Sequence, residues 1–181
     1  MPAYTRPNRT PTFARRPHGL LAVAGLALAG LVAPNIAPLP LRLVWNVSAS
    51  VPLGLYRIEP AAHLRAGDLA ALRPPPALAR FMAARRYVEA NALLLKPVAA
   101  VPCAAVCREA NLITIDGAPR AAALGEDRSG RPLPSWSGCR RLEPGELFLL
   151  APSSLDSFDS RYFGPVRISH VVGRAVPLWT W

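Results

Sequence analysis

The apolar residues of this chain fall into one long run near the N-terminus and many short runs after it. No charged residue occurs from Gly19 to Leu41, and the densest part, Leu20 to Ala33, consists of Leu, Ala, Val and Gly. A basic head before such a run is typical of a secretory signal or a signal-anchor. We expect residues 1–18 to be a basic cytoplasmic head, residues 19–41 a signal-anchor or transmembrane segment, and residues 42–181 an exported domain. Cleavage of the apolar segment is the alternative to a retained anchor.

Beyond residue 41, short apolar runs bounded by Gly and Pro predict a mainly β domain. Runs of this length between turn formers are typical of strands. The Asp-Gly step within Ile113–Ala118 predicts a hairpin, because this pair favours the positive φ angles of a tight turn. The runs that we assign to strands are Leu53–Ile58, Asp68–Leu72, Leu93–Val98, Leu112–Ile115, Leu147–Leu150 and Val166–Val172.

Two segments depart from the strand pattern. Residues 76–92 are rich in helix formers, and their apolar residues are spaced near one helical face, which predicts a small inserted amphipathic helix. Residues 119–138 are rich in Gly, Pro and Arg, which indicates a long loop.

The charge of the chain is strongly positive, with 21 Lys and Arg residues against 11 Asp and Glu, a net charge of +10. The basic residues are scattered along the chain, and no zinc-finger, RNP or homeodomain pattern accompanies them, so we expect no nucleic-acid partner. Four arginines precede the apolar run, which favours a role in membrane topology: Arg6, Arg9, Arg15 and Arg16.

Three cysteines allow one disulfide in an exported domain. We predict the pair Cys103–Cys107, because both lie on one short connection and need no long-range docking. A bridge from either of them to Cys139 is the alternative. The Cys-x3-Cys spacing is not that of common zinc sites and no His lies near it, so we expect no metal and no cofactor.

Lys96 is the one lysine among the 21 basic residues of the chain. It follows three leucines, and Glu89 is the only acidic residue within ten positions. On such an apolar strand, burial lowers a lysine pKa and allows the neutral amine to act as a base, whereas arginine stays protonated. The alternative is a lysine whose amine reaches solvent from a strand.

Four short motifs follow the apolar run in a fixed order. They are Asn46-x-Ser48-x-Ser50-x-Pro52-x-Gly54-x-Tyr56, Gly67-Asp68, Lys96 on its apolar strand, and Ser157-x-Asp159-Ser160-Arg161. Together they resemble the signal peptidase I superfamily of Ser/Lys proteases, over about residues 20–175. The first motif is similar to that of the conjugal-transfer TraF peptidases within it. The resemblance implies a signal-peptidase-like β domain behind one N-terminal anchor helix.

The resemblance also implies a role for each matching residue. Ser50 corresponds to the nucleophile and Lys96 to the general base. Ser48 corresponds to a serine that helps to form the oxyanion hole, and Ser157 to one that orients the lysine amine. Asp159 and Arg161 correspond to a structural pair.

The chain departs from the signal peptidase pattern at three places. Val51 follows the nucleophile where signal peptidases usually have Met, Pro102–Cys107 replaces a Gly-Asp turn, and Ala151-Pro152-Ser153 replaces Gly-Asp-Asn. These changes spare the catalytic pair and argue against ordinary leader-peptide specificity.

We therefore expect a Ser/Lys peptidase anchored in the inner membrane, with its catalytic domain in the periplasm. The implied substrate is a membrane-inserted pilin precursor or another exported protein, which is cleaved or cyclised for conjugative transfer. The alternatives are a general signal peptidase that removes leader peptides and a non-catalytic exported module for pilus assembly.

Overall fold

The structure is a computed structural model that describes residues 18–36, 43–89 and 91–181. The chain divides into two units, Met1–Pro40 and Leu41–Trp181. In the first, α1 (His18–Ile36) begins at the last residue of the predicted head and continues through the predicted apolar segment to Ile36. Residues 1–17 of the head and residues 37–41 of the segment lie outside the described residues. Across the three described ranges, no helix has both the length and the apolar character needed to cross a membrane.

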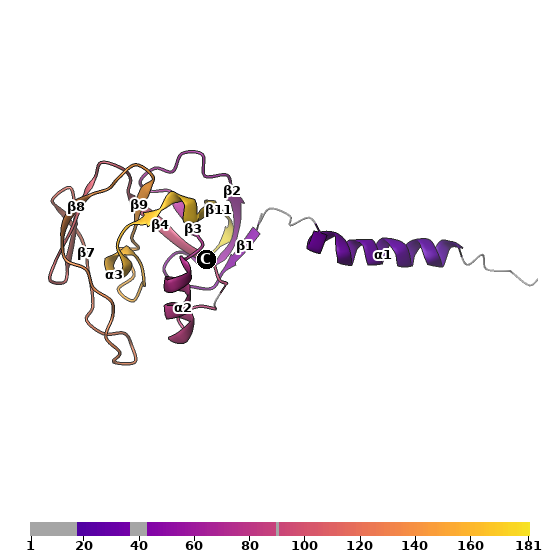
Figure 1. Ribbon diagram of the computed structural model, residues 1–181, viewed down its shortest axis with the longest axis horizontal. Coiled ribbons are helices and arrows are strands. Elements are labelled where there is room, and N and C mark those ends of the chain that lie inside the picture. Colours follow the sequence, from indigo (N-terminus) through magenta and orange to yellow (C-terminus); the bar gives the residue numbers. More distant parts are fainter. Residues whose placement is uncertain (1–17, 37–42, 90) are drawn as a thin grey trace, which may run out of the picture. The chain divides into compact units, whose positions relative to one another are not determined.

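The second unit consists of two antiparallel sheets, and its described residues confirm a mainly β domain. The seven-stranded sheet has the order β1 (Leu43–Asn46), β2 (Gly54–Glu59), β11 (Val171–Thr180), β3 (Leu69–Leu72), β4 (Leu94–Ala100), β9 (Glu146–Leu149), β10 (Val166–Arg167). The four-stranded sheet has the order β7 (Ala118–Ala122), β6 (Leu112–Ile115), β5 (Ala105–Glu109), β8 (Gly138–Arg141). Helices α2 (Pro76–Ala84) and α3 (Ser160–Phe163) and the 3-10 turn η1 (Ile168–His170) complete the unit. In Figure 1, the small sheet and the β1–β2 pair lie at opposite sides of this unit.

Strand β4 lies between β3 and β9 and is buried on both faces. Successive side chains of a strand point to opposite faces. Leu94 and Val98 therefore share one face, where they join the main apolar core, while Leu95 packs with Tyr56 and Ile58 on the other. Lys96 stands between Leu94 and Val98, so this register places its side chain on the face of the main core.

Local turn chemistry decides the boundaries of two predicted segments. The hairpin predicted at Asp-Gly is confirmed: Asp116 (φ 50°) and Gly117 (φ 79°) both have positive φ between β6 and β7. The helix predicted for residues 76–92 ends at Ala84, because Arg86 has a left-handed backbone (φ 58°) and its N–H donates to the carbonyl of Ala83.

Two further boundary predictions are wrong in part. The loop predicted for residues 119–138 begins inside β7 and contains a β-bridge between Glu126 and Pro132. The strand predicted for Val166–Val172 is divided by η1 into β10 and the start of β11.

The disulfide joins Cys107 to Cys139, so the predicted pair Cys103–Cys107 is wrong. Strands β5 and β8 pair with the two cysteines directly opposite each other, at a Cα–Cα distance of 4.0 Å. Directly opposite residues of antiparallel strands bring their Cβ atoms together, as a disulfide requires. Cys103 lies in the preceding turn with φ 75°, and it is exposed and free. The bridge ties β8 to β5, so residues 107–139, which include the segment 119–138, form a covalently closed loop.

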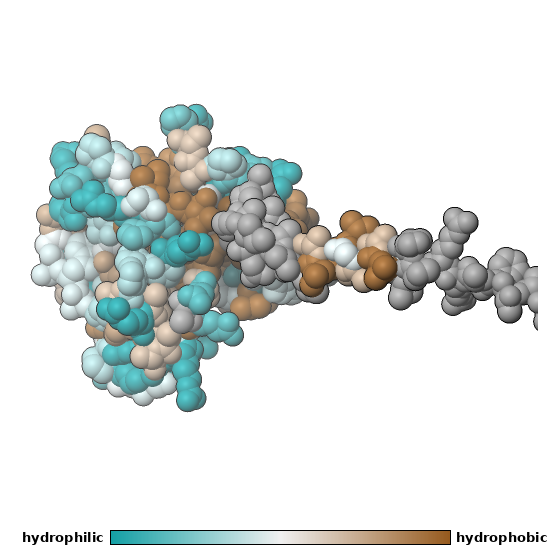
Figure 2. Space-filling model, turned by 45° about the vertical axis from the view of Figure 1, so that its right-hand side comes forward, coloured by the Kyte–Doolittle hydropathy of each residue, from teal (hydrophilic) through white to brown (hydrophobic). Residues whose placement is uncertain are grey.

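The surface of the second unit mixes hydrophilic and apolar residues (Figure 2). Three exposed tryptophans form one cluster on it, with ring centroids 5.3–6.0 Å apart: Trp45, Trp179 and Trp181. Leu55 of β2 pairs with Trp45 on one side and with Trp179 on the other. The aromatic contact therefore links β1 to β11 across the strand between them.

Loss of the disulfide should destabilise the protein, because it closes a loop between residues 32 positions apart. We expect Cys107→Ser and Cys139→Ser each to lower the free energy of unfolding by about 2–4 kcal/mol. The matched control, Cys103→Ser, should change it by about 0.5 kcal/mol or less. Chemical denaturation of the full-length variants measures this difference, and peptide mapping without reduction identifies the bridge. A peptide that links Cys103 to Cys107 would contradict the assignment.

Candidate active site

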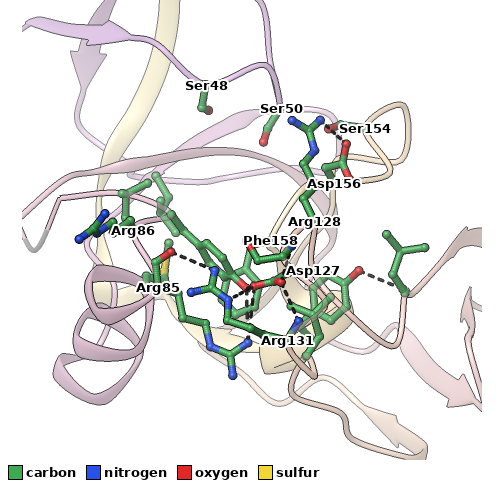
Figure 3. Close-up of a pocket in the computed structure, with 18 of the residues that line it drawn as sticks. Ser48, Ser50, Arg85, Arg86, Asp127, Arg128, Arg131, Ser154, Asp156 and Phe158 are labelled. Atoms are coloured by element: carbon green, nitrogen blue, oxygen red, sulfur yellow. Dashed lines mark hydrogen bonds and ion pairs between the residues drawn. The ribbon is translucent and has the colours of Figure 1, made fainter.

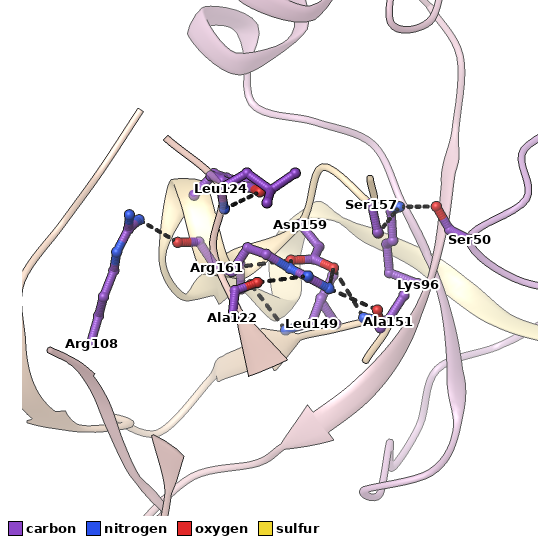
Figure 4. A network of polar contacts seen from close by, with 12 residues as sticks. Ser50, Lys96, Arg108, Ala122, Leu124, Leu149, Ala151, Ser157, Asp159 and Arg161 are labelled. Carbon is purple, nitrogen blue, oxygen red and sulfur yellow. Dashed lines mark hydrogen bonds and ion pairs between the residues drawn. The ribbon is translucent and has the colours of Figure 1, made fainter. Parts of the chain in front are cut away.

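The side chains of Ser50 and Ser157, which are far apart in the sequence, both contact the amine of Lys96 (Figure 4). Lys96 Nζ donates hydrogen bonds to Ser50 Oγ at 2.6 Å and to Ser157 Oγ at 2.8 Å. Lys96 is 4% exposed and Ser157 is 2% exposed, whereas Ser50 is half-buried. The amine is therefore buried behind Ser50 and shielded from water.

Burial lowers the pKa of Lys96 from its ordinary value to about 8. Desolvation is the largest cause, because the apolar surroundings disfavour the ammonium form. The negative charge of Asp159 opposes this shift, and the positive charge of Arg161 adds to it. At pH 7, a pKa near 8 leaves about a tenth of the molecules with a neutral amine, far more than an ordinary lysine would have.

The loop that carries Ser50 is held by the side chain of Asn46, which is buried at the end of β1. Asn46 Nδ2 donates to the carbonyls of Ser48 and Pro52, both at 2.9 Å. Its Oδ1 accepts hydrogen bonds from the N–H of Ser48 at 3.1 Å and from Ser48 Oγ at 3.2 Å. One side chain thus organises the whole turn, with the Ser48 hydroxyl bonded to Asn46 and the Ser50 hydroxyl to Lys96.

The far end of the same loop is fixed by Tyr56 and Gly54. Tyr56 Oη donates to the carbonyl of Pro52 at 2.7 Å from inside the core. Gly54 has φ 135°, and a Cβ at this position would collide with the carbonyl oxygen of Trp179 in β11. Only glycine fits this backbone and this contact. The sequence motif contained these residues, but it gave no signal that Asn46 and Tyr56 hold the loop.

Asp159 and Arg161 form a fully buried ion pair, as the resemblance implied. Arg161 Nε donates to Asp159 Oδ1 at 2.8 Å, and Nη2 donates to Oδ2 at 3.0 Å. The guanidinium also donates to the carbonyl of Ala122 in β7 and to that of Ala151 after β9. The Asp159 carboxylate in turn accepts from the N–H groups of Ala151 and Arg161. The pair therefore connects both sheets to the segment that carries Ser157.

Aromatic packing fixes the residue after Ser157. The Phe158 ring stacks on Tyr162 with 5.4 Å between centroids and on Phe81 of α2 with 5.5 Å. With Phe158 held in the core and Asp159 held by its ion pair, the backbone at Ser157 has one position. The Ser157 hydroxyl is thereby presented to Lys96.

Ser50 and Lys96 line a cavity of about 470 Å³ (Figure 3). Leu94, Phe158 and Tyr162 give it apolar surface, while the residues after α2 and those of the 124–133 loop give it charged surface. Within the described ranges, no group of three His, Cys, Asp or Glu side chains is arranged to hold a metal ion.

Two segments form the charged walls of this cavity, the residues after α2 and the 124–133 loop. A hydrogen bond joins them, with Tyr87 Oη donating to Asp127 Oδ2 at 2.6 Å. This hydrogen bond, with others from Arg131 and Ser129, holds the pKa of Asp127 well below its usual range. The cavity walls lie in the segments predicted as helix and loop, and no sequence motif marks these segments as part of the site.

The family of the chain follows from comparison with known sequences. The family model described as "Signal peptidase, peptidase S26" matches residues 16–181. The chain belongs to this peptidase family. The family implies a serine peptidase, and the match covers every residue of the site described above.

Two relatives of similar length support the family assignment. The "Conjugal transfer protein TraF" of Agrobacterium fabrum (strain C58 / ATCC 33970) is 36% identical over 170 residues, with 88% of this chain and 93% of the relative covered. The "Plasmid transfer protein TraF" of Escherichia coli is 31% identical over 173 residues, with 90% and 89% covered. A crystal structure of a signal peptidase I from Enterococcus faecalis V583 aligns with a TM-score of 0.37 and 19% identity, over 62% of this chain and 96% of that chain.

Removal of one partner of the buried ion pair should be costly, because the other charge stays buried without compensation. We expect Asp159→Asn to lower the free energy of unfolding by about 3–5 kcal/mol. The exposed pair Glu59–Arg174 is the matched control, and Glu59→Gln should have a much smaller effect, because solvent screens the exposed pair. Chemical denaturation of both variants measures the two effects. Similar costs for the two substitutions would contradict the structural role of Asp159.

Proposed function

We propose that the protein is a serine endopeptidase in which Ser50 is the nucleophile and Lys96 the general base. The observation that carries this proposal is the 2.6 Å hydrogen bond between Lys96 Nζ and Ser50 Oγ. A nucleophilic hydroxyl needs a base within this distance, and a buried amine with a lowered pKa meets that need. Membership of the peptidase S26 family supports the same reaction class.

The reaction begins when the neutral amine of Lys96 accepts the proton of the Ser50 hydroxyl. Ser50 Oγ attacks the carbonyl carbon of the scissile peptide bond, and the carbonyl oxygen becomes an oxyanion. As the tetrahedral intermediate collapses, the C–N bond breaks and the Lys96 ammonium gives its proton to the leaving amine. Water then attacks the Ser50 ester by the same route and releases the second product.

The oxyanion needs hydrogen-bond donors beside Ser50. We assign this role to the backbone N–H of Ser50 and the hydroxyl of Ser48. In the free protein the Ser48 hydroxyl bonds to Asn46 Oδ1 at 3.2 Å, a long hydrogen bond. Rotation of the hydroxyl away from Asn46 frees its proton for the oxyanion.

Ser157 acts as a positioning residue through its hydrogen bond to the same amine. Its oxygen accepts one proton of Lys96 Nζ and leaves the amine turned toward Ser50. The ion pair of Asp159 and Arg161 holds the segment that carries Ser157. In this proposal, only Ser50 and Lys96 take part in proton transfer, and the other residues hold them in position.

We further propose that the substrate is a pilin precursor processed for conjugal transfer, at the periplasmic side of the inner membrane. The names of the relatives and the resemblance of the Asn46–Tyr56 motif to TraF peptidases support this substrate class. The disulfide Cys107–Cys139 supports export, because disulfides persist in oxidising compartments. The basic head and the apolar run of the sequence support attachment through the N-terminal segment.

Ser50→Ala and Lys96→Arg should each abolish processing, since alanine has no nucleophile and arginine has no accessible neutral form. The measurement is mass spectrometry of a pilin precursor from the same transfer system, co-expressed with each variant. The product mass also separates a hydrolysed chain from a cyclic one, which lacks one water. Thermal unfolding of each variant is the control for folding. Cleavage by folded Lys96→Arg protein, or activity in Ser50→Ala and none in Ser48→Ala, would contradict the assignment.

The rate of processing should rise with pH through about 8, the pKa of Lys96. Only the neutral amine accepts the Ser50 proton, so kcat/KM should fall about tenfold for each pH unit below this value. The measurement is the initial cleavage rate between pH 6 and pH 9.5, with thermal unfolding recorded at each pH as the control. A rate that stays constant from pH 6 to pH 9 would contradict a titrating lysine base.

A further inference from the structure

The cavity beside Ser50 carries more positive than negative charge at the end of α2. Besides Lys96, seven charged residues line it: Arg85, Arg86, Arg128, Arg131, Glu126, Asp127 and Asp156. Arg128 pairs with Asp156 at 2.5 Å, which balances the charge on one side. On the other side, Asp127 lies 2.8 Å from Arg131 and 3.8 Å from Arg85, so one carboxylate serves two guanidinium groups. Without Arg86, three arginines and three carboxylates line the cavity, so the excess of positive charge comes from Arg86 and from Lys96 when its amine is protonated.

Arg86 follows α2, lines the cavity and is exposed. Figure 3 draws no hydrogen bond or ion pair from Arg86 to the other lining residues. Its backbone is left-handed (φ 58°), a conformation that side chains other than glycine disfavour. Glycine is the usual residue at such a helix end, so the arginine occupies this position at a cost in backbone strain.

Arg85 and Arg131, which line the same cavity as Arg86, are held in place by several contacts. The Arg85 guanidinium stacks on the Phe81 ring at 4.3 Å and donates to the carbonyl of Pro132 at 2.8 Å. Arg131 donates to Asp127 and to the carbonyl of Arg85. These two guanidinium groups are fixed by their contacts, whereas Arg86 is exposed and lines the same cavity.

We propose that Arg86, with Arg85 and Arg131, forms a subsite that binds a carboxylate of the substrate close to the scissile bond. This inference rests on the proposed peptidase function. A guanidinium group pairs with a carboxylate through two parallel hydrogen bonds, and such pairs are stronger than neutral ones. Because Arg86 lines the same cavity as Ser50 and Lys96, the carboxylate lies within a few residues of the cleaved bond. It belongs either to an Asp or Glu side chain or to the C-terminus of the chain.

The first test is digestion of a random mixture of synthetic peptides, prepared with free-acid and with amidated C-termini, and mass spectrometry of the cut bonds. We expect wild-type protein to prefer peptides with a carboxylate at one position near the cut. Arg86→Gln should reduce this preference about tenfold, the usual weight of a charge-assisted hydrogen bond. Arg86→Gly should reduce it equally, and since glycine suits the left-handed backbone, this variant keeps the fold.

The matched control is Arg80→Gln, which removes an exposed charge of α2 that does not line the cavity. It should keep the wild-type preference. Preference that depends on acidic side chains in both peptide sets identifies a side-chain carboxylate, whereas preference confined to free-acid peptides identifies the C-terminus. Cleavage that ignores carboxylates, or a preference that survives both Arg86 variants, would overturn the subsite and leave the peptidase proposal intact.

A second measurement tests the subsite if no peptide is cleaved. Ser50→Ala protein is titrated with two dye-labelled octapeptides that differ only in one Glu or Gln, each as free acid and as amide. We expect the peptides with a carboxylate to bind about tenfold more tightly, and Arg86→Gln in the same background to remove the difference. Equal binding of all four peptides would overturn the subsite. Absence of cleavage by wild-type protein counts against the peptidase proposal alone.

Discussion

The buried ion pair of Asp159 and Arg161 is the interaction on which the arrangement around Lys96 depends. Burying two charges costs several kcal/mol per ion unless their remaining hydrogen bonds are also made. Here they are made, by the carbonyls of Ala122 and Ala151 and by backbone N–H groups. In the described part of the chain, no buried side-chain nitrogen or oxygen lacks a partner. Since only one arrangement satisfies all of these groups, residues 157–161 have one position relative to both sheets.

The pairing also protects the chemistry of the neighbouring lysine. A lone carboxylate near Lys96 would stabilise the ammonium, raise its pKa and disfavour the neutral amine that the proposed mechanism needs. Asp159 does act in that direction, but Arg161 acts in the opposite one, and burial outweighs both. The ion pair therefore supplies rigidity to the segment with Ser157 without supplying net charge to the amine. Two uncharged side chains in place of Asp159 and Arg161 would have to form the same hydrogen bonds to hold this segment.

Local patterns were enough to predict the parts of the fold that local chemistry determines. The strand Leu112–Ile115 and its Asp-Gly turn were predicted correctly, and the apolar run around Lys96 correctly indicated a buried strand. The disulfide depends instead on the pairing of β5 with β8, and the Gly138–Arg141 strand has no apolar pattern that would reveal it. The early end of α2 depends on one left-handed residue, Arg86, which sequence periodicity does not detect.

The same distinction separates the chemistry of the site from its selectivity. Ser50, Lys96 and Ser157 stand in the motifs that carry the family resemblance, and the structure brings their side chains together. The cavity walls come from the end of α2 and the 124–133 loop, which no motif marks. The hydrogen bond between Tyr87 and Asp127 makes these two walls one unit, so a change in either segment moves the other. Charge in this unit can therefore differ without moving Lys96 and Ser157, whose positions depend on β4 and the Asp159–Arg161 pair.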